Sequence, residues 1–367
     1  MNRIKSLDGI RAISILMVLL GHASETMPSS IKNNSFLFFF TNSSLGVNIF
    51  FVISGFLITK LLLIEREKSG SINVKDFYLR RIYRIFPVFF LYIAVILLLK
   101  FTIVPTIFTD YYLVAFAALY LWNYKNMFYM DHEHGNGNWF FGHFWSLSME
   151  EQFYLIWPVM FMKIKEETLI KVVLAIIIFM PLARVLTYMY VPSVRGQIGM
   201  MLHTGGDSIL LGCLAAILER KPVFKDNLMK YLNNGYYIGV LALFLFVISP
   251  MLSHHFKGGY NITVGQSINN VVIMIIIFWC IYVPSKVADV LNNAILVRIG
   301  VLSYSLYIWQ QLFLTDKNKF WVNYFPQNLF IVVGVAFVSY YCVEKPILKL
   351  KKRYKKPLIQ PTELLPA

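Results

Sequence analysis

Charged residues are scarce in this chain of 367 residues, which contains 14% Asp, Glu, Lys and Arg against 57% hydrophobic residues. An ordinary soluble domain has about 25% charged and roughly 45–50% apolar residues. The shortage of charge excludes both a soluble globule and a disordered chain. Cysteine is equally rare: Cys213, Cys280 and Cys342 all lie inside apolar runs. This excludes a disulfide scaffold and predicts that the three thiols pack as small hydrophobic groups.

Long apolar runs take the place of the missing charge. A helix needs about 20 mostly apolar residues to cross a bilayer, and ten runs meet this requirement. They lie near residues 10–27, 44–64, 85–102, 145–162, 171–191, 199–218, 236–253, 266–283, 298–315 and 325–343. A further run, Tyr111–Trp122, is too short to span and is predicted to be re-entrant or interfacial. The expected fold is an all-α integral membrane protein with about ten transmembrane helices.

Acidic residues are few beside basic ones, 19 against 34, for a net charge of +15. The basic residues fall in gaps between apolar runs, which points to membrane topology and not to nucleic-acid binding. With a cytoplasmic N-terminus and ten crossings, 26 of the 34 Lys and Arg residues lie inside. This distribution follows the positive-inside rule and predicts that both termini are cytoplasmic. Residues 1–346 are the expected transmembrane domain, and 347–367 a basic, Pro-containing cytoplasmic tail.

Ionisable side chains within predicted spans cost at least about 2.5–3.5 kcal/mol near the bilayer centre, so they are candidates for function. Arg11 and His22 project from one face of the first span, with a rise of roughly 16 Å between them. This places Arg11 at the cytoplasmic rim and His22 near mid-membrane. Taken alone, a positive-inside anchor and a satisfied interior histidine are the simpler explanation. A cleaved signal peptide is a weaker alternative, because it needs neither residue.

Two adjacent carboxylates, Glu150 and Glu151, open another span together with Gln152. Glu150 and Tyr154 share a helix face at the i, i+4 spacing. An interfacial aromatic belt explains Trp145 and Tyr154 but not the carboxylates. These carboxylates need partners or water at the membrane entrance, so they are candidate site residues.

Three arginines, Arg80, Arg81 and Arg84, enter a span from the cytoplasmic side. The planar guanidinium can bind two phosphate oxygens at once. Positive-inside charge alone is again the simpler explanation.

Other polar residues in the spans are Asn48 and Ser54, which can line a cavity or allow close helix packing, and the carboxylate of Asp207. Histidines also occur in the predicted outer loops, but their spacing is not that of a zinc motif, and no metal site is expected. These histidines are His132, His134, His254 and His255.

Taken together, the segments resemble the acyltransferase-3 family of membrane O-acyltransferases, in the family's order and over roughly residues 5–346. The resemblance rests on six blocks: Leu7-Asp8-Gly9 with Arg11 and His22; Gly46 to Thr59; Arg81 to Pro87; His143 to Tyr154; Ser303 to Trp309; and Glu344 to Pro346. The family's ten-helix topology agrees with the count of apolar runs. Some relatives carry a further periplasmic hydrolase-like domain after these blocks, which is not expected here.

The resemblance implies transfer of an acyl group, most often acetyl, from a coenzyme A thioester to a sugar hydroxyl. The expected acceptor is a surface polysaccharide, lipopolysaccharide or exopolysaccharide, in part lipid-linked, and the expected location is the bacterial inner membrane. Acetyl-CoA is then a co-substrate, and no bound cofactor is expected. A hydroxyl nucleophile needs a base, for which histidine is the usual side chain.

The candidate residues follow from the motifs. The expected catalytic residues are His22, Glu150, Glu151 and His143, and the expected donor-binding residues are Arg11, Arg81, Arg84 and Arg80. Residues expected to line the site or support it are Asp8, Asn48, Ser54, Trp145, Ser148, Gln152, Tyr154, Asp207 and Tyr304. Many relatives carry Asp in place of Asn48 and His in place of Gln310, which puts a catalytic role for these two positions in doubt.

Three other functions fit part of the pattern. A transporter or flippase of a glycolipid or small solute also has intramembrane Arg, Glu and His residues, but the chain shows no internal repeat of the transporter kind. The second superfamily of membrane-bound acyltransferases also uses a histidine but lacks these motifs. A purely structural membrane subunit does not explain so many costly polar groups.

Overall fold

The structure is a computed structural model that describes residues 4–32, 34, 40–128 and 136–354. Within these ranges it contains helices and loops and no β-strand, as the sequence predicts. The longer helices are α1 (Lys5–Ala23), α4 (Ser43–Ser69), α5 (Val74–Thr102), α9 (Phe144–Lys163), α10 (Glu166–Tyr190), α12 (Asp207–Leu218), α13 (Pro222–Leu232), α16 (Gln266–Tyr282), α18 (Ala294–Phe313), α19 (Gln327–Ser339) and α20 (Lys345–Tyr354).

Shorter helices connect or extend these elements. They are α2 (Ser29–Lys32), α6 (Tyr112–Ala118), η1 (Trp122–Tyr124), α7 (Lys125–Phe128), α8 (Gly137–Phe140), η2 (Pro192–Gln197), α11 (Leu202–Gly205), α14 (Gly235–Leu243), η3 (Phe244–Ile248), α15 (Ser249–His255), η4 (Asn261–Gly265), α17 (Lys286–Leu291), η5 (Trp321–Asn323) and η6 (Tyr340–Glu344). The π-helical turns η3, η4 and η6 continue neighbouring α-helices, so several short elements belong to longer rods.

Seven rods in the described ranges are long and apolar enough to cross a membrane. They are Lys5–Ala23, Ser43–Ser69, Val74–Thr102, Glu166–Tyr190, Gly235–His255, Asn261–Tyr282 and Gln327–Leu350. Each coincides with one of the ten predicted spans. Two of the other three predicted spans correspond to α9 and α18, which have 20 residues each but carry more polar side chains. Ten crossings and cytoplasmic termini remain predictions.

The remaining predicted span, residues 199–218, is not one helix. The chain forms the four-residue α11 and then the twelve-residue α12, with Gly205 and Gly206 at the break. Glycine is a poor helix former, and hydrophobicity alone did not reveal the interruption. The short run Tyr111–Trp122 contains only the seven-residue α6 and then Tyr120, whose φ is 55°.

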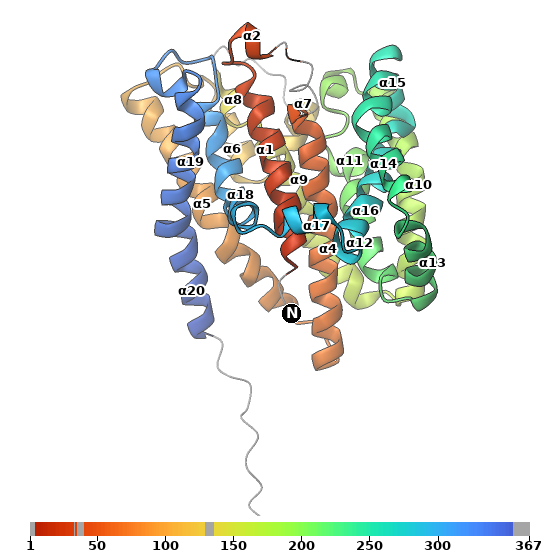
Figure 1. Ribbon diagram of the computed structural model, residues 1–367. Coiled ribbons are helices and arrows are strands. Elements are labelled where there is room, and N and C mark those ends of the chain that lie inside the picture. Colours follow the sequence, from red (N-terminus) through yellow and green to blue (C-terminus); the bar gives the residue numbers. More distant parts are fainter. Residues whose placement is uncertain (1–3, 33, 35–39, 129–135, 355–367) are drawn as a thin grey trace, which may run out of the picture.

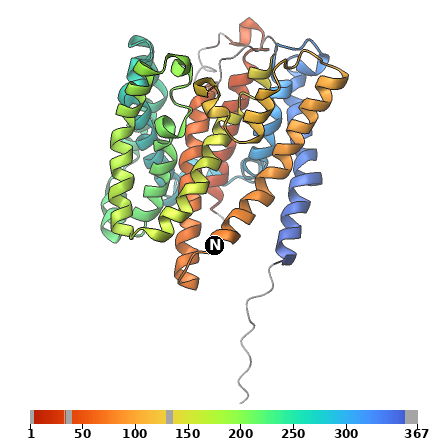
Figure 2. The ribbon, with the colours of Figure 1, turned by 180° about the vertical axis from the view of Figure 1, so that it is seen from behind.

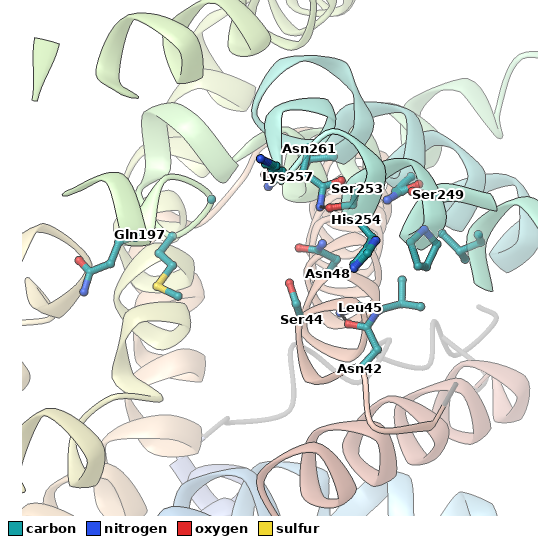
Figure 3. A pocket seen from close by; sticks show the side chains of 18 of the residues that line it. Asn42, Ser44, Leu45, Asn48, Gln197, Ser249, Ser253, His254, Lys257 and Asn261 are labelled. Carbon is teal, nitrogen blue, oxygen red and sulfur yellow. Dashed lines mark hydrogen bonds between the residues drawn. The ribbon is translucent and has the colours of Figure 1, made fainter. Parts of the chain in front are cut away.

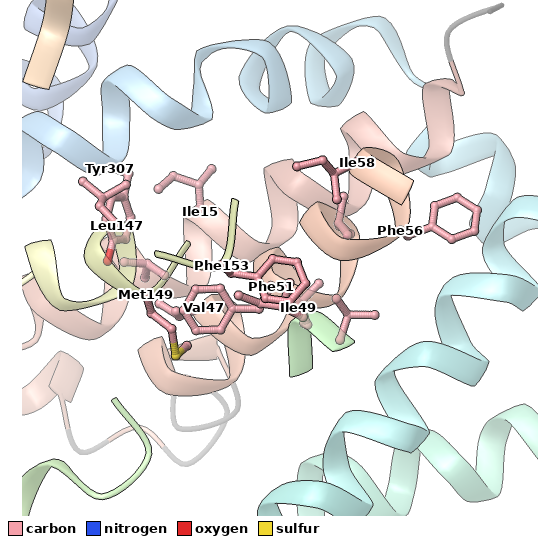
Figure 4. Packing of buried hydrophobic residues seen from close by; sticks show 14 of the residues in the cluster. Ile15, Val47, Ile49, Phe51, Phe56, Ile58, Leu147, Met149, Phe153 and Tyr307 are labelled. Carbon is pink, nitrogen blue, oxygen red and sulfur yellow. The ribbon is translucent and has the colours of Figure 1, made fainter. Parts of the chain in front are cut away.

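The helices α1, α4, α12 and α18 form the centre of the bundle, with α5 and α19 on one side and α10 and α13–α16 on the other (Figure 1). Two glycines allow α4 and α12 to approach closely: a Cβ on Gly55 would overlap the carbonyl oxygen of Ile209, and one on Gly212 that of Val52. Apolar side chains of α1, α4, α9 and α18 interlock beside this contact (Figure 4).

The lower end of the bundle in Figure 1, called the amino end here, holds the start of α1 and the whole of α20. The helix α5 rises obliquely from this end, as the view from behind also shows (Figure 2). Ion pairs join helices here, with Lys60 Nζ 2.6 Å from Glu219 and Arg66 Nη2 2.9 Å from Glu166. The predicted tail begins in α20, which is helical as far as Tyr354.

Candidate active site

The sequence-predicted base lies at the upper end of the bundle. His22 is in the last turn of α1, and its Nδ1 lies 2.9 Å from Oε1 of Gln310 on α18. Because an amide oxygen only accepts hydrogen bonds, Nδ1 carries the proton and Nε2 keeps its lone pair. The edge of the Trp139 indole lies against the imidazole, with ring centroids 5.7 Å apart. His22 is thus oriented as a proton acceptor.

The bounds of α1 differ from those of the predicted apolar run. The helix α1 begins at Lys5, five residues before the predicted run, and ends at Ala23. Arg11 therefore lies in the second turn of α1 and His22 in the last turn, and their depths in the membrane stay predictions. The apolar run begins later than the helix because Ser6 and Asp8 are polar, although both belong to α1.

The second candidate histidine is enclosed. His143 precedes α9 and is 2% exposed, and its Nδ1 lies 2.7 Å from Oε1 of Gln311. The same amide oxygen accepts the backbone N–H of His143 at 3.0 Å, and Tyr307 donates its hydroxyl to the carbonyl oxygen of His143. Two consecutive glutamines of α18 therefore each hold one histidine. The structure thus encloses His143 in the core, and its catalytic role stays a prediction.

A cavity of about 80 Å³ lies among α1, α4, α9 and α18. Arg11 and Glu150 bring opposite charges to its wall, which Ser54 also lines. Tyr304 also lines the cavity and donates its hydroxyl to the carbonyl oxygen of Ile85, 2.6 Å away. The structure thus brings together four candidates from separate sequence motifs.

The three arginines of α5 differ in their surroundings. Arg80 is ion-paired with Glu65 at 2.8 Å, so a protein carboxylate already holds it. The guanidinium of Arg81 lies over the ring of Tyr154, 4.4 Å from its centroid. Arg84 is exposed, one turn further along the helix. Arg84 and Arg81 are therefore better placed than Arg80 to receive a phosphate.

The remaining residues of the α9 motif support the fold around the site. Gln152 and Asn123 exchange amide hydrogen bonds of 2.8 and 2.9 Å, and Gln152 also donates to the carbonyl oxygen of Tyr120. These bonds fix the segment from Tyr120 to Asn123 against α9. Glu151 and the fully buried Ser148 each keep one buried side-chain oxygen without a hydrogen-bond partner in the described part of the chain.

Asp207 does not join the site. It forms a fully buried ion pair with Arg184 at 2.5 Å, and Ser267 and Asn270 also donate to its carboxylate. This network ties α12 to α10 and α16, which gives Asp207 a structural role. Asp8 lies in the first turn of α1, where its backbone packs against α18.

Asn48 and Trp145 face a different and larger cavity, of about 740 Å³, instead of the small one. Among the described residues no group of three or more His, Cys, Asp or Glu side chains gathers as metal ligands do. His132 and His134 lie outside the described residues.

Sequence reasoning missed the two residues that hold the histidines. Gln310 had been put in doubt, and Gln311 was not considered. A signal was present, because two adjacent amides in an apolar run are as costly in a membrane as the groups that were selected. Trp139 and Tyr307 were also missed, since aromatic residues are too common here, at 16%, to mark a site.

The fold and the site define a polytopic helical membrane protein. It has a histidine held by a glutamine, and a cavity lined by an arginine and a glutamate. Residues 4–344 match the profile of the family described as "Acyltransferase domain". The chain belongs to this acyltransferase-3 family, as its motifs indicated.

Two curated relatives come from Staphylococcus aureus. "Putative O-acetyltransferase SACOL0978" of strain COL is 28% identical over 95% of this chain and 58% of its own length. "O-acetyltransferase OatA" of strain NCTC 8325 / PS 47 is 26% identical over 94% of this chain and 57% of its own length. The chain thus spans little more than half the length of these relatives. No solved structure matches the chain.

Proposed function

We propose that the chain is a membrane O-acetyltransferase that moves an acetyl group from acetyl-CoA to a sugar hydroxyl of a bacterial envelope polysaccharide. The observation that carries the proposal is the orientation of His22 by Gln310. His22 lies on the same helix as Arg11, which lines the small cavity together with Glu150. The family and the names of the relatives support acyl transfer.

In the proposed reaction, Nε2 of His22 accepts the proton of the acceptor hydroxyl. The oxygen attacks the thioester carbonyl carbon, a C–O bond forms, and the C–S bond breaks. The thiolate of coenzyme A leaves and takes the proton back from the imidazolium. A positioned base of this kind contributes roughly 10²–10⁴-fold to a rate. The alternative route is an acyl-histidine relay, in which the imidazole carries the acetyl group before the hydroxyl attacks.

The donor is proposed to enter from the amino end, which the positive-inside pattern assigns to the cytoplasm. Arg84 and Arg81 lie on the first half of α5 and are suited to its phosphates. Arg11 lies further in, and His22 stands about 16 Å beyond it along α1. An extended pantetheine arm matches that distance, so the phosphates stay at the amino end while the thioester reaches His22.

The carboxylate of Glu150 balances the charge of Arg11 in the small cavity. An arginine without a nearby carboxylate would be costly to bury here, so Glu150 helps to keep the guanidinium inside the bundle, ready to face an anionic donor. The protein is proposed to reside in the bacterial cytoplasmic membrane, with no bound cofactor and no metal in the reaction.

The test is an NMR spectrum of the purified surface polysaccharide from a strain that lacks this gene. The strain is complemented with wild-type protein, His22→Ala, or the control His255→Ala, whose side chain is exposed near the end of α15, all at matched membrane levels. We expect an O-acetyl signal with wild type and the control only. An unchanged acetyl signal combined with reduced polysaccharide export would instead favour a transporter, and full activity of His22→Ala would remove the assigned base.

A further inference from the structure

Glu344 is a buried carboxylate near the amino end of the bundle. It is 5% exposed and ends the π-helical turn η6, where α19 continues into α20 beside α5 (Figure 1). It forms no ion pair with the described part of the chain, and Ser305 of α18 donates its hydroxyl to Oε2 at 3.4 Å, which is long for such a bond. A buried carboxylate with so weak a partner is costly, and single π-helical turns are frequent at functional sites.

Two contacts of α18 place Glu344 beside the arginine helix α5. Tyr304 donates its hydroxyl to the carbonyl oxygen of Ile85, the residue after Arg84, at 2.6 Å. The next residue of α18, Ser305, is the one that contacts Glu344. The turn η6 also packs directly against α5. In agreement with this packing, the strongest charge interaction of the Glu344 carboxylate is with Arg84.

The charges in this region balance one another without forming close pairs. Arg84 is exposed and forms no ion pair with the described residues, in contrast to Arg80, which Glu65 holds at 2.8 Å. Glu344 also interacts with Arg11, more weakly than with Arg84. Its carboxylate therefore acts on both guanidinium groups through its charge and not through a hydrogen bond. Such an interaction stays appreciable over several ångströms, because the effective dielectric constant of a protein is about 20 and that of water about 80.

This arrangement differs from that of a structural carboxylate. The carboxylate of Asp207 lies 2.5 Å from Arg184 and accepts further hydrogen bonds, so its charge is fully offset where it stands. Glu344 has no such partner, and its charge is available to the side chains around it. It also lies apart from the large cavity at the upper end, whose wall Figure 3 shows and which none of Glu344, Arg84 and Arg11 lines.

We propose that Glu344 is a positioning residue of the donor site, whose negative charge opposes Arg84 and Arg11 and so limits their affinity for an anionic ligand. A phosphate group that enters replaces Glu344 as the main counter-charge of Arg84. The spent coenzyme A keeps its phosphates, so the same charge helps it to leave. The identity of the anion as coenzyme A rests on the proposed function; the charge relationship of Glu344 with the two arginines does not.

The test measures binding of coenzyme A, the product, to the detergent-solubilised full chain by isothermal titration calorimetry. The buffer is mildly alkaline, so that carboxyl groups are ionised. Glu344→Gln removes the charge but keeps an oxygen for Ser305, whereas Ser305→Ala removes the hydrogen bond and keeps the charge. We expect Glu344→Gln to bind coenzyme A roughly 3–10-fold more tightly than wild type, as for one partly screened charge at about 10 Å. Ser305→Ala and Glu344→Asp should bind with nearly wild-type affinity.

The matched control is Glu67→Gln, which removes an exposed carboxylate at the same end of the bundle, where Glu67 pairs with Arg220. It should bind as wild type does, because solvent screens an exposed charge. Unchanged or weaker binding by Glu344→Gln would overturn the proposal, and so would an equal gain in Glu67→Gln. Thermal unfolding identifies a folding defect, and Glu344→Leu, which also removes the charge, is the second variant if Glu344→Gln does not fold.

Binding and turnover together separate this inference from the proposed function. If wild type does not bind coenzyme A, the donor assignment fails and the inference fails with it. If Glu344→Gln binds coenzyme A more tightly but neither protein transfers an acetyl group, the proposed function fails and the role of Glu344 stands. Where transfer occurs, Glu344→Gln should lower both the acetyl-CoA KM and the inhibition constant of coenzyme A, and leave the acceptor KM unchanged.

Discussion

Oε1 of Gln310 lies 2.9 Å from Nδ1 of His22. This contact joins α1 and α18 through two residues that are 288 positions apart in the chain. Glutamine does not titrate, so it holds the imidazole in one tautomer without competing for its proton. Gln310 thus places a hydrogen-bonding group that does not titrate against His22. Gln310 is a positioning residue, because it acts through His22 and touches no reacting atom in the proposed chemistry.

Replacing Gln310 with Leu should reduce kcat roughly tenfold or more, a part of the roughly 10²–10⁴-fold that a positioned base contributes. The acetyl-CoA KM should stay constant, since the arginines are untouched. Initial rates of acetyl transfer by isolated membranes measure both quantities. Gln310→His, which again offers a ring nitrogen to Nδ1, should recover part of the loss; a purely structural role would give no such split between kcat and KM.

The two histidines should respond differently to substitution. His22→Ala should abolish transfer and leave the thermal unfolding temperature nearly unchanged, because His22 is partly exposed in the last turn of α1. His143→Ala should lower that temperature, because it empties a core position and frees the buried amide of Gln311. Unfolding and activity of both variants are compared in one detergent, and equal unfolding temperatures would contradict the assignment of His143 to the core.

The apolar runs predicted the helices well because burial in lipid imposes a composition over about 20 residues. They could not predict the break between α11 and α12, which depends on Gly205 and Gly206 and not on hydrophobicity. They also misjudged where α1 begins. A polar residue at a helix end does not raise the hydrophobicity of a segment, so the criterion missed the first turn of α1.

The sequence identified the candidate residues by their chemistry, but it did not identify the residues that they contact. The i, i+4 rule relates residues on one helix, whereas the contact of His22 with Gln310 crosses between α1 and α18. For the same reason the sequence treated Arg80 as equivalent to Arg84, although Glu65 of α4 holds Arg80. Asp207 was selected because a buried carboxylate is costly, and the structure shows that Arg184 offsets that cost.

Glu25, in the loop after α1, should give stability a small pH dependence. Burial raises the pKa of its carboxyl above the usual value, although Lys317 opposes the shift. The folded state then holds this proton more tightly than the unfolded state does, so the contribution to stability falls as pH rises past the unfolded pKa of about 4.5. Glu25→Gln should flatten this part of a plot of unfolding temperature against pH from 4 to 7. If the substitution leaves the slope of unfolding temperature against pH unchanged, groups other than Glu25 cause the pH dependence.

The buried ion pair of Arg184 and Asp207 should matter for stability and not for chemistry. Asp207→Ala leaves a fully buried guanidinium without its carboxylate, which costs about 3–5 kcal/mol of unfolding free energy. The double variant Arg184→Met with Asp207→Leu should recover most of that loss, since no buried charge remains. Denaturant unfolding of the solubilised protein measures both. A catalytic Asp207 would instead leave the double variant stable but inactive.

The arginines of α5 provide the sharpest test of the donor side. Arg84→Ala should raise the acetyl-CoA KM by roughly tenfold or more, the effect of losing a hydrogen bond to a charged group, and leave the acceptor KM constant. Arg80→Ala is the matched control on the same helix, because Glu65 already pairs with Arg80 and its loss should change the donor KM little. Dephospho-coenzyme A thioesters, which lack one phosphate, extend the comparison: if Arg84 binds that phosphate, the variant should no longer distinguish the two donors. Equal donor KM values for Arg84→Ala and Arg80→Ala would show that the exposed arginine does not hold the phosphates.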